Sequence, residues 1–312
     1  MHLSRIAGGC RALQRSSPHI SWKPTGKRQQ TIAAEVRRSG IGLHSGAATT
    51  ARLLPAMAGE GRYFVLSLGR SRIPATIEHA VNSPLCTTLC YGGAMVRTVE
   101  HLLSALEVCG VDNCRIEIEG GEEVPFLDGS AKHWVEAIVH AGMCEATDFN
   151  GNTNEKMAPF LYGPQYVCRG DSFIIAFPSS KLYITYGINF PKVPAIGCQW
   201  FSCSMDPDTY SKEIASSRSF CIYEEIQHMH DAGLIQGGSI ENALVCSAVS
   251  GWLNPPLRFN NEPCRHKILD LIGDFSLFAR NGHQGLPFSH IIAYKAGHSM
   301  HVDFVRRLAN IW

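Results

Sequence analysis

The spacing of apolar side chains in the first half of the chain predicts both strands and helices. Runs rich in alternating or β-branched residues, TARLLPA (50–56), RYFVLSL (62–68) and NCRIEIEG (113–120), are bounded by Gly, Pro and Asn and predict strands. Two longer segments, 98–110 and 130–142, repeat apolar residues at the spacing of one helix face. This half is therefore predicted to be α+β.

Both predicted helices carry residues typical of helix ends. Thr98 is expected to be the N-cap of the first helix and Gly110 its stop. Ser130 and Gly142 are expected to do the same for the second helix.

The second half mixes the same kinds of element. Strands are predicted at FIIAFP (173–178), KLYITYGINF (181–190) and HIIAYKAG (290–297), and helices through 223–233 and 264–274. The two halves share this inventory without a visible sequence repeat.

A polar stretch without hydrophobic periodicity, CEATDFNGNTNEKMAP (144–159), is the best candidate for a linker. We therefore expect a leader at 1–30, an α+β domain at 31–145, a linker at 146–159 and a second α+β domain at 160–312.

The leader is predicted from charge. Before Glu35 the chain has six basic side chains and no acidic one: Arg5, Arg11, Arg15, Lys23, Lys27 and Arg28. Such a segment is typical of an organellar import peptide, and the expected organelle is the mitochondrion, with the chloroplast as the alternative. The other interpretation is a basic tail without a targeting role. The rest holds 22 basic and 27 acidic residues, a balance that gives no indication of nucleic-acid binding.

The twelve cysteines do not have the dense spacing of a small disulfide-rich secreted domain. We expect them to be mostly reduced and buried. The CTTLC pair, Cys86 and Cys90, has one residue too many for a thioredoxin-like motif and lacks a second pair for a zinc ribbon. No apolar run approaches the roughly 18 residues of a membrane-spanning helix, so no transmembrane segment is expected.

The segment CRHKILDLIGD (264–274) places chemistry inside an apolar helix. His266, Asp270 and Asp274 recur every four residues and would lie close to one line along the helix. A buried carboxylate must be paired or bound to a metal, because its desolvation is costly. Imidazole and carboxylate one turn apart suit zinc, and the alternative is an ordinary His–Asp hydrogen bond.

The first predicted helix offers a third ligand. His101 could reach the same ion, while Glu100, about 100° around the helix, would reach only a water on it. The alternative is a solvated acid beside a histidine that caps the helix. His298 follows a glycine at the end of a predicted strand, where a chain commonly turns into a pocket. His301 is expected to be a surface or core residue without a partner.

These motifs occur in an order that resembles a known family. TVEHLLSAL, VPFLDGSA, SRSF, GGSIENALV, LRFNNEPCRHKILDLIGD and AYKAGH, spread between GIGLHSG (40–46) and residue 298, resemble the UDP-3-O-acyl-N-acetylglucosamine deacetylases of lipid A synthesis, with the plant branch closest. The resemblance implies two similar α+β domains, each a sheet layer packed on helices, with the helix layers facing each other around the active site.

The resemblance also implies roles for individual residues. His101, His266 and Asp270 would bind one Zn²⁺, with Fe²⁺ as an alternative, and Glu100 would be the general base.

Ser219, where the family usually has Thr, would stabilise the oxyanion. His298, charged and oriented by Asp274, would protonate the leaving amine, with Glu100 sharing or competing for that role. Lys267 would contact substrate.

Phe220 and Ile222, with residues of the following helix such as Met229, would line a passage for the acyl chain. Cys221, where many bacterial relatives have Gly, could narrow that passage. Asp128 is expected to be structural.

By this resemblance the chain would hydrolyse the N-acetyl group of UDP-3-O-[(3R)-3-hydroxyacyl]-N-acetylglucosamine, an early committed step of lipid A biosynthesis. The alternatives are a zinc amidase for another acylated amino sugar, a relative that binds without hydrolysis, and a thiol protein built on CTTLC. A monomer whose partner is the UDP-linked substrate is expected.

Overall fold

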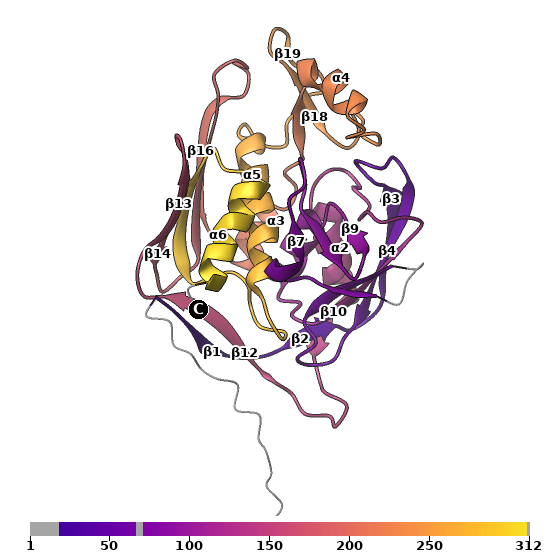
Figure 1. The fold of residues 1–312 in the computed structure, drawn as a ribbon, viewed down its shortest axis with the longest axis vertical. Helices are drawn as coiled ribbons and strands as arrows, with labels where there is room; N and C mark the ends of the chain where they lie inside the picture. The colour runs from indigo at the N-terminus through magenta and orange to yellow at the C-terminus, as the bar shows by residue number, and fades with distance from the viewer. Residues whose placement is uncertain (1–18, 67–70, 311–312) are drawn as a thin grey trace, which may run out of the picture.

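Two five-stranded sheets lie on opposite sides of a layer of helices (Figure 1) in the computed structural model, which describes residues 19–66 and 71–310. In sheet order, the first contains β3 (Val36–Ile41), β4 (Ala48–Pro55), β10 (Cys114–Glu119), β5 (Arg62–Leu66) and β6 (Arg72–Pro74). The second contains β13 (Gln165–Arg169), β14 (Ser172–Pro178), β20 (Ser289–Tyr294), β15 (Tyr183–Phe190) and β16 (Gly197–Ser204).

The two sheets share one topology. Counted along the chain, each has the strand order first, second, fifth, third, fourth. In each, only the pair formed by the fifth and third strands is parallel. A helix precedes and another follows the fifth strand in both halves. The shared inventory of elements seen in the sequence therefore extends to their connection in space.

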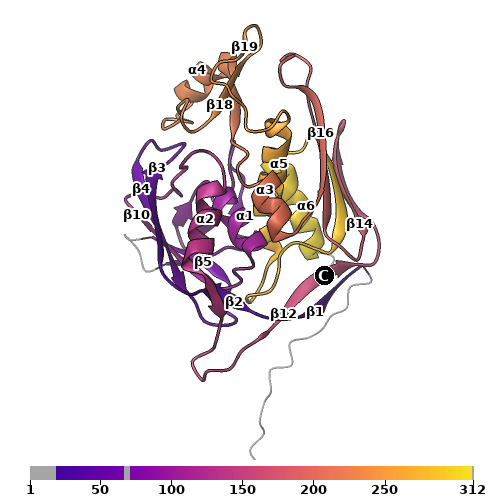
Figure 2. The ribbon, with the colours of Figure 1, turned by 180° about the vertical axis from the view of Figure 1, so that it is seen from behind.

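The helices fill the space between the sheets (Figure 2). Those of the described residues are α1 (Glu100–Cys109), α2 (Lys132–Ala141), α3 (Pro207–Glu213), α4 (Tyr223–Asp231), α5 (Glu262–Phe275) and α6 (His298–Asn310), with 3-10 turns η1 (Ile77–His79) and η2 (Ser276–Phe278). All except α4 belong to the central layer, and α4 lies at one end of the molecule.

Four smaller groups of strands are formed outside the two main sheets by the described residues, and they include the nine-residue strand β1 (Ile20–Arg28). They pair as β1 with β12 (Glu155–Leu161), β2 (Gln30–Ile32) with β11 (Met143–Glu145), β7 (Ala80–Val81) with β8 (Thr88–Tyr91) and β9 (Ala94–Val96), and β17 (Phe220–Ile222) with β18 (Leu244–Ser247) and β19 (Gly251–Trp252). We call residues 220–252, which hold β17, α4, β18 and β19, the insert. It stands above the central helices in Figure 1.

Helices α1 and α5 cross at the centre of the molecule with almost nothing between their backbones. A Cβ atom at Gly273 of α5 would lie only 2.1 Å from the carbonyl oxygen of Glu100 in α1. Any side chain at 273 would therefore push the two helices apart. This close crossing brings the candidate metal ligands of the two halves together.

The helix boundaries confirm most of the sequence predictions and correct their N-caps. Gly110 ends α1 in the left-handed conformation, as predicted. Thr98 is not the N-cap of α1, which is Val99, because the Thr98 hydroxyl instead donates to Glu123 (2.7 Å). Ser130 is likewise one residue too early, since Ala131 is the N-cap of α2. The mixed α+β class is confirmed.

The N-terminal region enters the fold earlier than the predicted leader suggests. Strand β1 lies within 1–30 and carries Lys23, Lys27 and Arg28, half of the basic residues that suggested a leader. The other three lie outside the described residues. The end of the predicted linker, 146–159, is likewise part of strand β12, which pairs antiparallel with β1.

None of the described helices is both long and apolar enough to span a bilayer. The cysteines of the described residues are all free, and they range from buried to exposed. Their burial was overestimated, and that they are reduced stays a prediction.

Candidate active site

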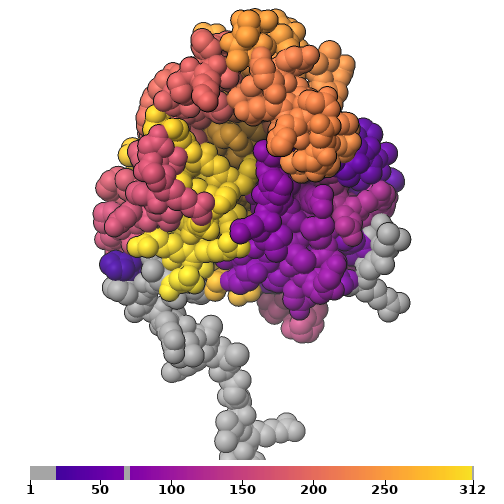
Figure 3. Space-filling view, turned by 45° about the horizontal axis from the view of Figure 1, so that its top comes forward, coloured from indigo at the N-terminus to yellow at the C-terminus, as the bar shows by residue number. Residues whose placement is uncertain are grey.

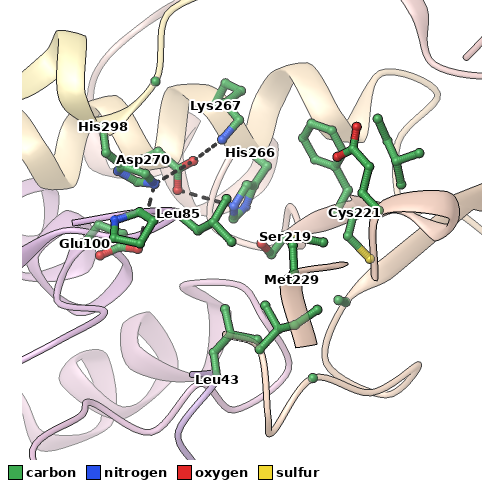
Figure 4. Close-up of a pocket in the computed structure, with 18 of the residues that line it drawn as sticks. Leu43, Leu85, Glu100, Ser219, Cys221, Met229, His266, Lys267, Asp270 and His298 are labelled. Carbon is green, nitrogen blue, oxygen red and sulfur yellow. Dashed lines mark hydrogen bonds and ion pairs between the residues drawn. The ribbon is translucent and has the colours of Figure 1, made fainter. Parts of the chain in front are cut away.

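A pocket of about 830 Å³ opens where α1, α5 and the start of α6 meet the insert. Figure 3 shows this hollow between the orange insert, the purple segment near residue 85 and the yellow C-terminal helix. One side of the pocket is lined by histidines and carboxylates, and the other mainly by apolar side chains (Figure 4).

Three side chains from two helices could hold a metal ion. His101 from the first turn of α1, and His266 and Asp270 from α5, place one ligand atom each within 4.8 Å of one another. Nε2 of His101 lies 3.5 Å, and Nε2 of His266 3.3 Å, from Oδ1 of Asp270. All three side chains are buried.

The hydrogen bonding of His266 determines which nitrogen faces the site. Its Nδ1 is 3.0 Å from the carbonyl oxygen of Ser217, which can only accept, so Nδ1 carries the proton. Burial lowers the pKa of His266 to about 3, so the ring is neutral and has one N–H. Nε2 therefore presents a lone pair to the Asp270 carboxylate.

That arrangement fits a cation. Oδ1 of Asp270 is buried and has no hydrogen-bond donor among the described residues, while Oδ2 accepts from Lys267 Nζ (2.8 Å). A lone pair and a carboxylate oxygen facing each other at 3.3 Å repel unless positive charge lies between them. Two imidazole nitrogens and one carboxylate are the ligands of a catalytic zinc site with an open position.

Glu100 lies beside this cluster. Its Oε2 accepts a hydrogen bond from the backbone N–H of Thr87 (3.0 Å), and its Oε1 is 3.9 Å from Nε2 of His298. Burial raises the pKa of Glu100 to about 7, against the opposing charge of His298. A carboxyl group with a pKa near neutrality can both accept and release a proton at working pH.

His298 is the first residue of α6, a helix that the sequence analysis missed. Its Nδ1 is 2.8 Å from Oδ2 of Asp274. Burial alone would lower the pKa of His298, but the charges of Asp274, Asp270 and Glu100 outweigh it and raise this pKa to about 10. The imidazolium of His298 is thus stable at neutral pH and can donate a proton into the pocket.

His301 corrects a prediction, because it has two partners. It is fully buried, and its Nδ1 is 2.8 Å from the same Asp274 oxygen that His298 contacts. Its Nε2 is 3.0 Å from the Tyr186 hydroxyl, which donates to the carbonyl oxygen of Ala296. The missed signal was the spacing of His298 and His301, which are three residues apart and so share one helix face.

The remaining predicted residues also line the pocket. Ser219 precedes β17 and is held by a hydrogen bond from its N–H to the Gly129 carbonyl (2.8 Å). Phe220 and Ile222 of β17 form part of the apolar side. Lys267 Nζ lies over the Phe220 ring, 5.7 Å from its centroid.

Further along the apolar side are Met229 of α4 and Leu43 (Figure 4). Cys221 also faces the pocket, and burial raises its thiol pKa to about 11, so it is a neutral lining group. Asp128 accepts hydrogen bonds from the N–H and hydroxyl of Ser130 and lies outside this lining.

Two cations at the pocket edge were not predicted. Arg169 ends β13 and Lys295 follows β20, and both line the pocket. They pair with Asp303 and Asp171, respectively. Arg169 stands in no motif and is distant in sequence from Lys295, which lies in AYKAGH, so only the sheet reveals that the two are close.

Comparisons with known proteins agree with this geometry. The family model described as LpxC, UDP-3-O-acyl N-acetylglycosamine deacetylase, matches residues 29–310. The probable UDP-3-O-acyl-N-acetylglucosamine deacetylase 1, mitochondrial, of Arabidopsis thaliana is 56% identical over 301 residues, covering 94% of this chain and 91% of the relative. The UDP-3-O-acyl-N-acetylglucosamine deacetylase of Nostoc sp. (strain PCC 7120) is 46% identical over 286 residues, covering 90% and 98%. The chain therefore belongs to the UDP-3-O-acyl-N-acetylglucosamine deacetylase family.

Proposed function

We propose that this protein is a zinc-dependent deacetylase that removes the N-acetyl group of UDP-3-O-[(3R)-3-hydroxyacyl]-N-acetylglucosamine, an early committed step of lipid A biosynthesis. The products are acetate and the free amine. The observation that carries the proposal is that Oδ1 of Asp270 has no hydrogen-bond donor in the part of the chain that the structure describes and is faced by the lone pair of His266 and by His101. Family membership supplies the substrate class.

In this proposal His101, His266 and Asp270 hold one zinc ion, and iron(II) fits the same donor set. When bound, the ion polarises the acetyl carbonyl and makes water a better nucleophile at neutral pH. Nδ1 of His266 keeps its bond to Ser217, so that the lone pair of Nε2 stays available to hold the ion.

The proton transfers fall to Glu100 and His298. Glu100 takes a proton from the attacking water as the oxygen–carbon bond forms, and the Ser219 hydroxyl donates to the acetyl oxygen as negative charge develops there. The carbon–nitrogen bond then breaks as His298 gives its proton to the amine. Asp274 holds Nδ1 of His298, so its Nε2 is the atom that donates.

The pocket lining suggests how the substrate lies. The apolar side with Phe220, Ile222 and Met229 suits the acyl chain, and Lys267 suits a polar group of the sugar. Arg169 and Lys295, at the pocket edge, suit the negative diphosphate.

We also propose that the two sheets with their helices are two similar domains, with residues 146–159 connecting them. The shared strand order and the matching positions of the flanking helices support this division. The mitochondrial names of the Arabidopsis relatives support a mitochondrial location, with the chloroplast as the alternative organelle.

Acetate release from the UDP-linked substrate tests the proposal. The full chain is assayed with zinc, after chelation and with zinc restored, beside Glu100→Gln and the control Glu136→Gln on the exposed face of α2. We expect metal-dependent release that falls by about 10²–10⁴-fold in Glu100→Gln only. One bound zinc without acetate release would refute the substrate assignment. Equal release by both variants would refute the role of Glu100.

A further inference from the structure

The solvent side of the second sheet carries an unusual set of side chains. The register of its strands places three rows across this side, and we call their fourteen residues the aromatic face. The rows are Cys168–Phe173–Tyr294–Gly187–Trp200, Tyr166–Ile175–Ile292–Thr185–Ser202 and Phe177–His290–Tyr183–Ser204. The set contains six aromatic and two aliphatic side chains, and it contains no Lys, Arg, Asp or Glu.

Many of these side chains remain open to solvent. Tyr166 is 56% exposed, Trp200 48% and Phe177 41%. The indole of Trp200 lies over Gly187 and stacks on Tyr294 with an interplanar angle of 2°. Helices α5 and α6 pack on the other side of this sheet, and the aromatic face is the side they leave open (Figure 1).

The first sheet provides an internal comparison, because it has the same strand order. Its corresponding middle row is Arg37–Arg52–Glu117–Val65–Arg72. Ion pairs tie this row together, with Arg52 2.8 Å from Glu117 and Arg37 3.3 Å from Glu119 of the adjacent row. That is the surface expected of a sheet side that faces water. The aromatic face differs from it in chemistry although its strands are arranged alike.

A contiguous apolar surface of several hundred Å² usually marks an interaction site. Five strands about 4.8 Å apart, each five to eight residues long at about 3.3 Å per residue, cover roughly 500 Å². Two such surfaces in contact bury about 1,000 Å², which reaches the lower bound for a specific protein interface.

We propose that the aromatic face binds the aromatic face of a second copy of this chain, giving a two-fold dimer with the two sheets stacked. None of the fourteen residues is Lys, Arg, Asp or Glu, and the charge next to them is the Arg307 guanidinium, which lies over the Tyr166 ring on the edge strand β13, 5.6 Å from its centroid. The rest of the face therefore meets little like-charge repulsion from its own copy and needs no complementary charge. An identical sheet has the same twist, which lets two sheets pack about 10 Å apart. The catalytic pocket is lined from the helix side and stays open. This proposal replaces the monomer expected from the sequence and does not depend on the proposed activity.

Sedimentation velocity of the full chain at about 1–100 µM tests the dimer. We expect wild type to approach twice 34.2 kDa. Ile292→Glu, in the middle row, buries two unpaired charges at a two-fold contact and should weaken association by more than about a hundredfold. Val65→Glu, in the middle row of the first sheet, is the matched control and should leave the dimer intact.

Trp200→Lys, on the half-exposed edge strand β16, repeats the test should Ile292→Glu fail to fold, as judged by circular dichroism. A wild-type monomer throughout the concentration range would overturn the proposal. The proposal would also be overturned if Ile292→Glu and Trp200→Lys both folded and both still formed the dimer, because association would then use another surface. Binding of the monomer to phosphatidylcholine vesicles through this face would also overturn it, since a lipid surface would be the occupant.

Discussion

Replacing Asp274 by Asn removes the charge that contributes most to keeping His298 protonated. The pKa of His298 is about 10 against an ordinary 6.5, which corresponds to about 5 kcal/mol of stabilisation of the imidazolium at 1.4 kcal/mol per tenfold change in proton affinity. Burial opposes this rise, and Asp274 is the largest of the three carboxylates that produce it. Its share is therefore at least a third of this, on the order of 2 kcal/mol, and Asp274→Asn should lower the pKa of His298 by more than about one.

The consequence is a change in the pH dependence of kcat/KM for acetate release. In wild type, activity should fall below about pH 7 as Glu100 gains a proton, and above about pH 10 as His298 loses one. In Asp274→Asn the basic limb should move to lower pH by more than about one, while the acidic limb stays near 7. Bound zinc should be unchanged, because Asp274 is not one of the proposed ligands.

The control is Asp112→Asn, which removes another buried carboxylate, paired with Lys156 and outside the pocket lining. Both limbs should be unaffected in this variant. A folded Asp274→Asn protein whose basic limb coincides with that of wild type would refute the assignment of this limb to His298.

Three further changes test the surroundings of the site. His301→Phe removes a hydrogen bond to the buried Asp274 carboxylate, so kcat should fall about tenfold or more while KM changes little. His301→Gln should restore part of the lost kcat, and equal kcat in wild type and both variants would contradict the positioning role of His301. Gly273→Ala should lower both the free energy of unfolding and zinc affinity, because the new Cβ would meet α1; unaltered melting and zinc titration would argue against the close crossing. His266→Ala should lose stoichiometric zinc by elemental analysis yet keep its fold, and retention of zinc would remove His266 from the ligand set.

The elements of the fold that are set by local pattern could be predicted from the sequence. The apolar spacing of α1 and α5 identified both helices, and helix geometry alone placed Asp270 one turn from His266. The prediction of Thr98 as the N-cap of α1 was wrong because its hydroxyl donates a hydrogen bond to Glu123, which is remote in sequence.

The partners of buried groups and the exposure of sheet faces could not be predicted in this way. Tyr186 is 115 residues from His301, so only the packing of β15 against α6 makes them neighbours. Alternation along β15 indicates two faces, but it does not say which one the helices cover.

The crossing of α1 and α5 has a consequence for how this protein can change over evolution. The two helices meet backbone to backbone at Gly273, so neighbouring side chains have little scope to change the spacing of the proposed ligands and the proposed base. The insert is built differently, since α4 has no buried residue although Met229 lines the pocket. Under the proposed function, substitutions can therefore accumulate in the insert and alter which acyl chains are accepted, while the proposed ligands and base are inherited almost unchanged.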